Sequence, residues 1–114
     1  MTNDAAPFAL VVRFTVHAGA EARFDDLMAA TARMIRETEP ETLIYAIHQV
    51  DDAPRVRVFY ELYRNREAFD VHNEQPHIRA FLNAREPMLE ATDVTFMSLT
   101  DGKVPGQPGE DEPR

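Results

Sequence analysis

Residues 43–64 read LIYAIHQVDDAPRVRVFYELYR, two apolar segments that flank a short polar link. Both segments, Leu43 to Val50 and Arg55 to Arg64, are rich in the β-branched and aromatic residues that favour strands. The link Asp51-Asp52-Ala53-Pro54 has the composition of a tight turn. These residues therefore predict an antiparallel hairpin in the middle of the chain.

An amphipathic helix is predicted on each side of this hairpin. Before it, from Ala20 to Glu39, apolar side chains recur every three or four residues, and Pro40 ends the pattern. After it, Asn65 is a suitable N-cap for a second helix. Pro76 interrupts this helix, so we expect the segment from His77 to Arg85 as a separate piece.

A further strand is predicted outside each helix. Phe8 to Val16 alternates apolar residues with a second set that includes Arg13, which is the period of a strand. Asp93 to Leu99 is expected as the fourth strand. The resulting order, β-α-β-β-α-β, is that of the α+β, ferredoxin-like fold with an antiparallel four-stranded sheet.

Two helices can cover only one face of such a sheet. In the third predicted strand, Val58 and Tyr60 alternate with Phe59 and Tyr63, so both of its faces are apolar. An uncovered apolar face indicates an interaction surface. We expect a second copy of the chain to cover it, which makes a homodimer through the open sheet face.

Composition excludes several classes of function. The chain has 114 residues, enough for one domain, and a formal net charge of −8. That charge argues against nucleic acid and anionic membranes as partners. Without cysteine there are no disulfides and no Cys-ligated metals. The chain lacks a run of about 18 apolar residues and a signal-peptide pattern, so we expect a cytoplasmic protein.

The two ends differ from the rest of the chain. The last fourteen residues, DGKVPGQPGEDEPR, hold three of the four glycines and one aliphatic residue. Such a segment has too little apolar surface to fold by itself. We therefore divide the chain into a flexible lead (1–6), a domain (7–100) and a disordered or draped tail (101–114).

Two ionisable residues interrupt the apolar pattern. Glu61 is expected on the same strand face as Phe59 and Tyr63, where it either pairs with Arg13 or has a pKa shifted by burial. His72 is expected on the buried side of the second helix. It either packs on the sheet with one nitrogen satisfied or acts as a general base, because imidazole titrates near neutral pH.

Other candidate residues follow from spacing. His72 and His77 lie five residues apart, about 140° around an ideal helix, which is poor spacing for a metal, so we expect no metal site. His48 is opposite in phase to Tyr45 and points either into a pocket or into the dimer interface. Aromatic residues such as Phe69 either fill the core or line a flat cleft for a planar ligand. Without a glycine-rich phosphate loop, no nucleotide cofactor is expected.

One segment is more specific than these patterns. Residues 61–77, ELYRNREAFDVHNEQPH, resemble the antibiotic-biosynthesis monooxygenase-like family, whose members form dimeric α+β barrels. The similarity in element order extends over about residues 8–99. The family is known for oxidising quinols and other electron-rich aromatics with O₂. The resemblance therefore implies a monooxygenase of the quinol-oxidising branch that needs no metal, flavin or nicotinamide, with O₂ as co-substrate.

The resemblance also implies roles for the residues of this segment. His72 becomes the base or the group that stabilises the anion, Tyr63 lines the pocket, Glu61 orients a partner, and His77 lies at the edge of the pocket. Strand phase and the aromatic set add further residues expected to contact a small aromatic substrate: His48, Tyr45, Arg13 and Phe69.

Two alternatives to quinol oxidation remain open at this point. The Pro76-His77 ending also resembles a branch that isomerises or cleaves small phosphorylated signalling ketones, for which Arg13, Arg55 or Arg57 would bind the phosphate. The same fold also serves as a non-catalytic module that binds a small ligand. Haem-degrading relatives use a tryptophan that this chain lacks, which argues against haem oxygenation.

Overall fold

The order of elements in the computed structural model, which describes residues 5–105, is β-α-β-β-α-α-β. The elements are β1 (Phe8–Val16), α1 (Glu21–Thr38), β2 (Thr42–Val50), β3 (Ala53–Tyr63), α2 (Arg66–Glu74), α3 (Pro76–Arg85), the short 3₁₀ helix η1 (Glu86–Met88) and β4 (Leu89–Ser98). This order confirms the α+β, ferredoxin-like fold, with the second helix divided at Pro76 as predicted. Among these helices, none is both long and apolar enough to cross a membrane.

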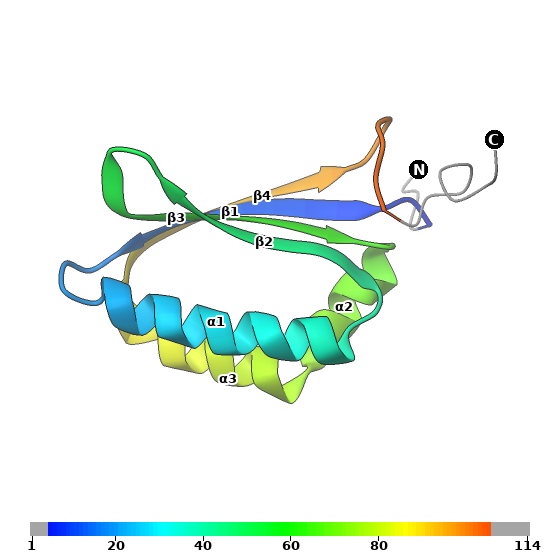
Figure 1. Ribbon diagram of the computed structural model, residues 1–114. Helices are drawn as coiled ribbons and strands as arrows, with labels where there is room; N and C mark the ends of the chain where they lie inside the picture. Colours follow the sequence, from blue (N-terminus) through cyan, green and yellow to red (C-terminus); the bar gives the residue numbers. More distant parts are fainter. Residues whose placement is uncertain (1–4, 106–114) are drawn as a thin grey trace.

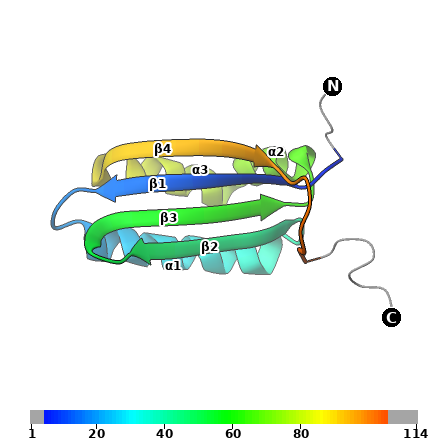
Figure 2. The same ribbon diagram turned by 90° about the horizontal axis from the view of Figure 1, so that it is seen from above.

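The strands form one antiparallel sheet in the order β2-β3-β1-β4. Because β1 lies between β3 and β4, Leu10 is paired with Glu61 on one side and with Phe96 on the other. The three α-helices lie against the same face of the sheet (Figure 1), and Figure 2 shows the strand order from the opposite, open face. The row Glu61–Leu10–Phe96 therefore faces the helices.

The core fills the space between this face and the helices. Leu10, Val12 and Phe14 of β1 are buried there, because alternate side chains of a strand point to the same face. Phe24 of α1 and Phe81 of α3 approach from the other side, with ring centroids 6.4 Å apart. Large aromatic side chains thus determine the separation of the two layers.

Local sequence features determine the start of α2 and the turn between β2 and β3. The side chain of Asn65 accepts a hydrogen bond from the Ala68 N–H at 2.8 Å, which confirms Asn65 as the N-cap of α2. The hairpin turn is tighter than predicted, because β3 already begins at Ala53. Asp52 adopts a φ of 64°, a left-handed conformation that Asp tolerates better than most residues.

The fourth strand is longer than predicted and begins at Leu89 rather than Asp93. Its first residues include Glu90 and Ala91, which have little intrinsic preference for strands. Backbone pairing compensates for this low strand preference, because β1 extends to Val16 and that residue pairs with Leu89. The prediction was wrong at this end because it depended on residue type alone.

The open face of the sheet carries a smaller apolar cluster. Ala9 and Leu62 are buried in it together with Val104, which belongs to the segment after β4. Figure 2 shows this segment crossing the ends of the strands. Of the expected lead and tail, residues 1–4 and 106–114 lie outside the described residues.

Candidate functional site

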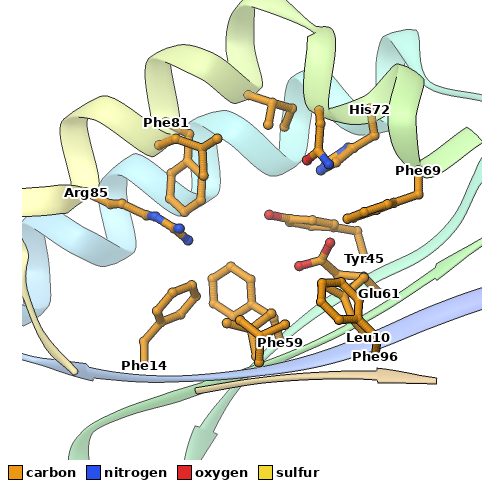
Figure 3. Close-up of a pocket in the computed structure, with 15 residues that line it drawn as sticks. Leu10, Phe14, Tyr45, Phe59, Glu61, Phe69, His72, Phe81, Arg85 and Phe96 are labelled. Atoms are coloured by element: carbon orange, nitrogen blue, oxygen red, sulfur yellow. The ribbon is translucent and has the colours of Figure 1, made fainter. Parts of the chain in front are cut away.

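A cavity of about 190 Å³ lies between the sheet and the helices. Figure 3 shows aromatic side chains around it, and they include Phe14, Phe59, Phe69 and Phe81. Five polar side chains also line it: Tyr45, Glu61, His72, Asn73 and Arg85. An apolar space with a few convergent polar groups is the usual form of a small-ligand site.

The mouth of this cavity lies at the β4 edge of the sheet. Val94 and Phe96 of β4 line the cavity and are 47% and 59% exposed. Leu82 of α3 also lines it and is 37% exposed. Phe96 stacks on Phe8 at 5.8 Å between centroids. Phe96 also contacts Phe69 edge-on, with ring centroids 6.0 Å apart, so the aromatic wall of the cavity continues to its mouth. Large exposed apolar side chains at an entrance favour an apolar ligand.

Glu61 is a buried carboxyl group that faces the cavity from β3. It is 6% exposed and accepts a hydrogen bond of 2.5 Å from the Tyr63 hydroxyl, two residues along the same strand face. Burial raises the pKa of Glu61, although the Tyr63 hydrogen bond and the charge of His72 oppose the shift. The predicted ion pair with Arg13 is wrong, because Arg13 is exposed on the open face.

Tyr63 donates a hydrogen bond to Glu61 and does not itself line the cavity. Its side chain is completely buried, and burial together with the nearby Glu61 carboxylate raises its pKa well above the ordinary value. The phenol therefore remains protonated and acts as a hydrogen-bond donor. This corrects the expectation that Tyr63 forms part of the pocket wall.

His72 of α2 lines the cavity and is held by a second buried carboxylate. Its Nδ1 lies 2.6 Å from Oε1 of Glu39, at the C-cap of α1. The His72 ring also lies 5.0 Å from the ring of Tyr63 and 5.7 Å from that of Tyr45. One nitrogen of His72 is thus satisfied, as one interpretation of the sequence expected, and the ring also lines the cavity, while its role as a general base stays a prediction.

Glu39 joins three elements through its two oxygens. Oε1 also accepts a hydrogen bond of 2.8 Å from the Thr42 hydroxyl, and Oε2 is bonded to Nε2 of His77 on α3. Burial alone would raise the pKa of Glu39, but the hydrogen bonds from His72, Thr42 and His77 lower it below its usual value. His77 is therefore part of this buried cluster and not, as expected, at the edge of the cavity.

Nothing in the sequence pattern indicated this cluster. Glu39 ends a helix just before Pro40, where a carboxylate is usually solvated, and it lies 33 residues before His72. The helical spacing of His72 and His77 suggested that their rings diverge, but the break at Pro76 lets both reach one carboxylate. Within residues 5–105, no group of three or more His, Cys, Asp or Glu side chains is arranged to hold a metal ion.

Tyr45 brings a phenol into the cavity from β2. Figure 3 shows its hydroxyl pointing into the space between Arg85 and Glu61. Burial, reinforced by the charge of Glu61, raises the pKa of Tyr45 well above its ordinary value. Tyr45 is thus a neutral hydrogen-bonding group, in agreement with its predicted place in the pocket. Phe69 lines the cavity as predicted.

Arg85 is a charged cavity residue that sequence reasoning missed. Its guanidinium lies 4.8 Å from the Phe14 ring centroid and 5.2 Å from that of Phe81, and burial lowers its pKa. A usable signal existed, because Arg85 follows Ile78 and Phe81 by seven and four residues. That spacing places it on the buried stripe of α3.

Other residues expected at the site lie elsewhere. His48 is exposed on the open face, with Nδ1 3.2 Å from the Val58 carbonyl oxygen, so the sheet separates it from the cavity. Arg57 is bound in a two-fold interaction with Asp25 of α1, at 2.9 and 3.0 Å. Arg55 interacts with Glu90 at 3.2 Å. Neither these two arginines nor Arg13 lines the cavity, so they do not supply a phosphate site there.

Solved structures share this arrangement of sheet and helices. A protein of Caulobacter crescentus, named a candidate antibiotic biosynthesis monooxygenase, has a TM-score of 0.81 at 19% identity, over 86% of this chain and 93% of that chain. A protein of Nitrosomonas europaea with the same name has a TM-score of 0.77 at 20% identity, over 88% and 96%. A protein of Mycobacterium tuberculosis has a TM-score of 0.78 at 26% identity, over 85% and 98%.

The sequence itself matches a family model. No curated protein shows a significant match to the chain. The model described as antibiotic biosynthesis monooxygenase matches residues 7–84, from the start of β1 into the last turn of α3. The match contains the cavity residues Tyr45, Glu61 and His72, and it spans well over half of the sequence. On this evidence, the chain belongs to the antibiotic biosynthesis monooxygenase family.

Proposed function

We propose that the protein oxidises a quinol or another polyphenolic aromatic, with O₂ as co-substrate and without a metal, flavin or nicotinamide. The observation that carries the proposal is the cavity, whose aromatic walls surround a phenol, a carboxyl group and an imidazole. Such walls suit a flat ring, and the three polar groups can hold or move protons. Membership of a monooxygenase family supports the same class of reaction.

Removal of a phenolic proton is the first step, and His72 is the base. The Glu39 carboxylate, with its lowered pKa, accepts the hydrogen bond from Nδ1–H of His72. This interaction selects the tautomer in which Nε2 carries the lone pair. A histidine with an orienting carboxylate is well suited to take a proton near neutral pH.

Oxygen chemistry follows from the phenolate. The phenolate transfers one electron to O₂, the two radicals combine through a new C–O bond on the ring, and the O–O bond then breaks. One oxygen atom stays on the ring and the other leaves as water, so the quinol supplies all four electrons that O₂ accepts. The phenol of Tyr45 and the carboxyl of Glu61 bind the substrate oxygens, while the phenylalanine walls exclude bulk water.

Oxygen uptake in the presence of a panel of benzene and naphthalene quinols tests this function. We expect His72→Ala to lose about 10²- to 10⁴-fold of the rate, the usual contribution of a general base. His17→Ala is the matched control, because His17 is exposed at the end of β1 and should keep the wild-type rate. Equal rates for His72→Ala and wild type would remove His72 from the reaction. The absence of oxygen uptake by wild type with every quinol would refute the oxidation itself.

The proposal includes a homodimer through the open sheet face. Tyr60 and Met97 are only partly buried there, beside the small cluster of Ala9, Leu62 and Val104. Sedimentation velocity should give twice the chain mass of 13.0 kDa. Tyr60→Asp should shift the protein toward the monomer, since a charge in an apolar interface is costly. A wild-type monomer at all concentrations measured would contradict the dimer.

A further inference from the structure

One hydrogen-bond donor in the cavity lacks an acceptor. The Nε of Arg85 is buried and has no hydrogen-bond partner within the described part of the chain. A buried donor without an acceptor is destabilising. The Phe14 and Phe81 rings compensate in part through cation–π contacts, but they accept no hydrogen bond in the plane of the guanidinium.

The same molecule shows how such a group is satisfied elsewhere. Arg57 lies on the same side of the sheet, and its Nε and Nη2 donate to the two carboxylate oxygens of Asp25 at 2.9 and 3.0 Å. Arg85 presents the same planar set of donors, but Glu86 and Glu61 attract it only through space, and Glu61 accepts the Tyr63 hydroxyl. The group that Arg85 lacks is therefore a carboxylate.

The cavity has room for a ligand that brings one. Figure 3 shows Arg85 and Glu61 on opposite sides of the cavity, with the Tyr45 hydroxyl between them. Its volume of about 190 Å³ compares with the roughly 150 Å³ of an apolar cavity that binds benzene. One or two aromatic rings therefore fit between the two polar ends.

The geometry points to Arg85 as the residue that binds a substrate carboxylate, so that the ligand is a small aromatic acid carrying phenolic hydroxyls. Its ring packs among the phenylalanine walls and its carboxylate pairs with Nε and an Nη of Arg85. Its hydroxyls face Tyr45, Glu61 and His72. This inference rests on the proposed function, whose substrate class it narrows from quinols in general to quinol carboxylates.

Binding measured without oxygen tests the assignment independently of turnover. Isothermal titration calorimetry under nitrogen compares 2,5-dihydroxybenzoate with its methyl ester. Wild type should bind the acid about 10- to 100-fold more tightly than the ester, the range that charge-assisted hydrogen bonds give. Arg85→Met keeps the apolar stem between the two rings but removes the donors. It should bind acid and ester equally, with the ester affinity within about twofold of wild type.

Two further variants complete the test. Arg79→Met is the control, since Arg79 is exposed on the same helix and should leave the preference for the acid unchanged. Arg85→Lys keeps the charge but not the planar pair of donors, so the preference should fall without disappearing. It also reports on the site if Arg85→Met does not fold, as circular dichroism would show.

The results separate this inference from the oxidation. An acid preference that is absent from wild type, or that survives in Arg85→Met, would overturn the role of Arg85 even if neutral quinols are oxidised. A preference that depends on Arg85 supports the carboxylate site even in a protein that takes up no oxygen, in which case the proposed oxidation fails alone.

Discussion

Two sets of polar side chains lie between the helices and the sheet, and they differ in how they are satisfied. In the first, both oxygens of Glu39 are bonded, one to His72 and one to His77. In the second, around the cavity, Arg85 has a buried nitrogen without an acceptor, and burial raises the pKa of Glu61 in spite of the Tyr63 hydrogen bond and the charge of His72. His72 belongs to both sets, since it is bonded to Glu39 and also lines the cavity.

This difference distinguishes polar groups that stabilise the fold from polar groups that are available to a ligand, although both lie between the helices and the sheet. The Glu39 cluster ties α1, α2 and α3 together and leaves neither carboxylate oxygen unpaired, as expected for a group that stabilises the fold. In the cavity, by contrast, the Arg85 Nε has no acceptor within the described part of the chain, which is destabilising until a ligand supplies one. Such an unpaired donor is understandable where a phenolic acid supplies its acceptor. His72 connects the two sets, because Glu39 fixes the orientation of its ring and the ring lines the cavity.

Replacement of Glu39 should have the largest effect on stability. Glu39→Ala leaves two buried imidazoles without their acceptor and opens a gap at the end of α1. Removing one partner from a buried charged pair typically costs about 3–5 kcal/mol. Urea denaturation followed by circular dichroism should show this loss in the free energy of unfolding.

An exposed pair provides the comparison for that measurement. Glu41 lies two residues further along and bonds Arg64 at 2.7 Å, with its side chain 54% exposed. Glu41→Ala should cost less than about 1 kcal/mol, as surface pairs do. Equal losses for the two variants would mean that the Glu39 cluster does not hold the helices together.

Much of the fold could be predicted because it depends on local patterns. Alternation along Phe8–Val16 and the cap at Asn65 are properties of adjacent residues, and the structure confirms both. The start of β4 was missed because Leu89 enters the sheet by pairing with Val16 of β1, which is a long-range effect. Residue preference contains no information about such pairing.

The site was harder to predict, because its contacts join distant elements. Burial of Glu61 and the inward position of His72 followed from strand and helix period. The pairing of Glu61 with Arg13 ignored that period, since Arg13 lies on the face of β1 that turns away from the helices. Glu39 could not have been found this way, because nothing local to it indicates that two histidines more than thirty residues later converge on it.

A smaller effect, the pH dependence of stability, should separate the two carboxyl groups. The folded protein lowers the pKa of Glu39 from its ordinary value of 4.5, so the unfolded chain takes up that proton first as the pH falls. The stabilising contribution of Glu39 is therefore present above pH 4.5 and is lost as the pH falls through the lowered pKa. For Glu61, whose pKa is raised, the folded protein holds the proton more tightly. Stability is then lost as the pH rises from 4.5 through the raised value.

Thermal melts of Glu39→Gln and Glu61→Gln between about pH 3 and about pH 8 should show these opposite slopes. The stability deficit of Glu39→Gln relative to wild type should shrink below pH 4.5, because wild type then also carries a neutral side chain there. The stability of Glu61→Gln relative to wild type should increase as the pH rises above 4.5, by about 1.4 kcal/mol for each unit of pKa shift that the substitution removes. Both carboxyls face His72, Glu39 also faces Thr42 and His77, and Glu61 also faces Tyr63 and Arg85. Parallel curves for the two variants would mean that the carboxyls have equivalent environments, and the distinction between a satisfied cluster and an unsatisfied cavity would then fail.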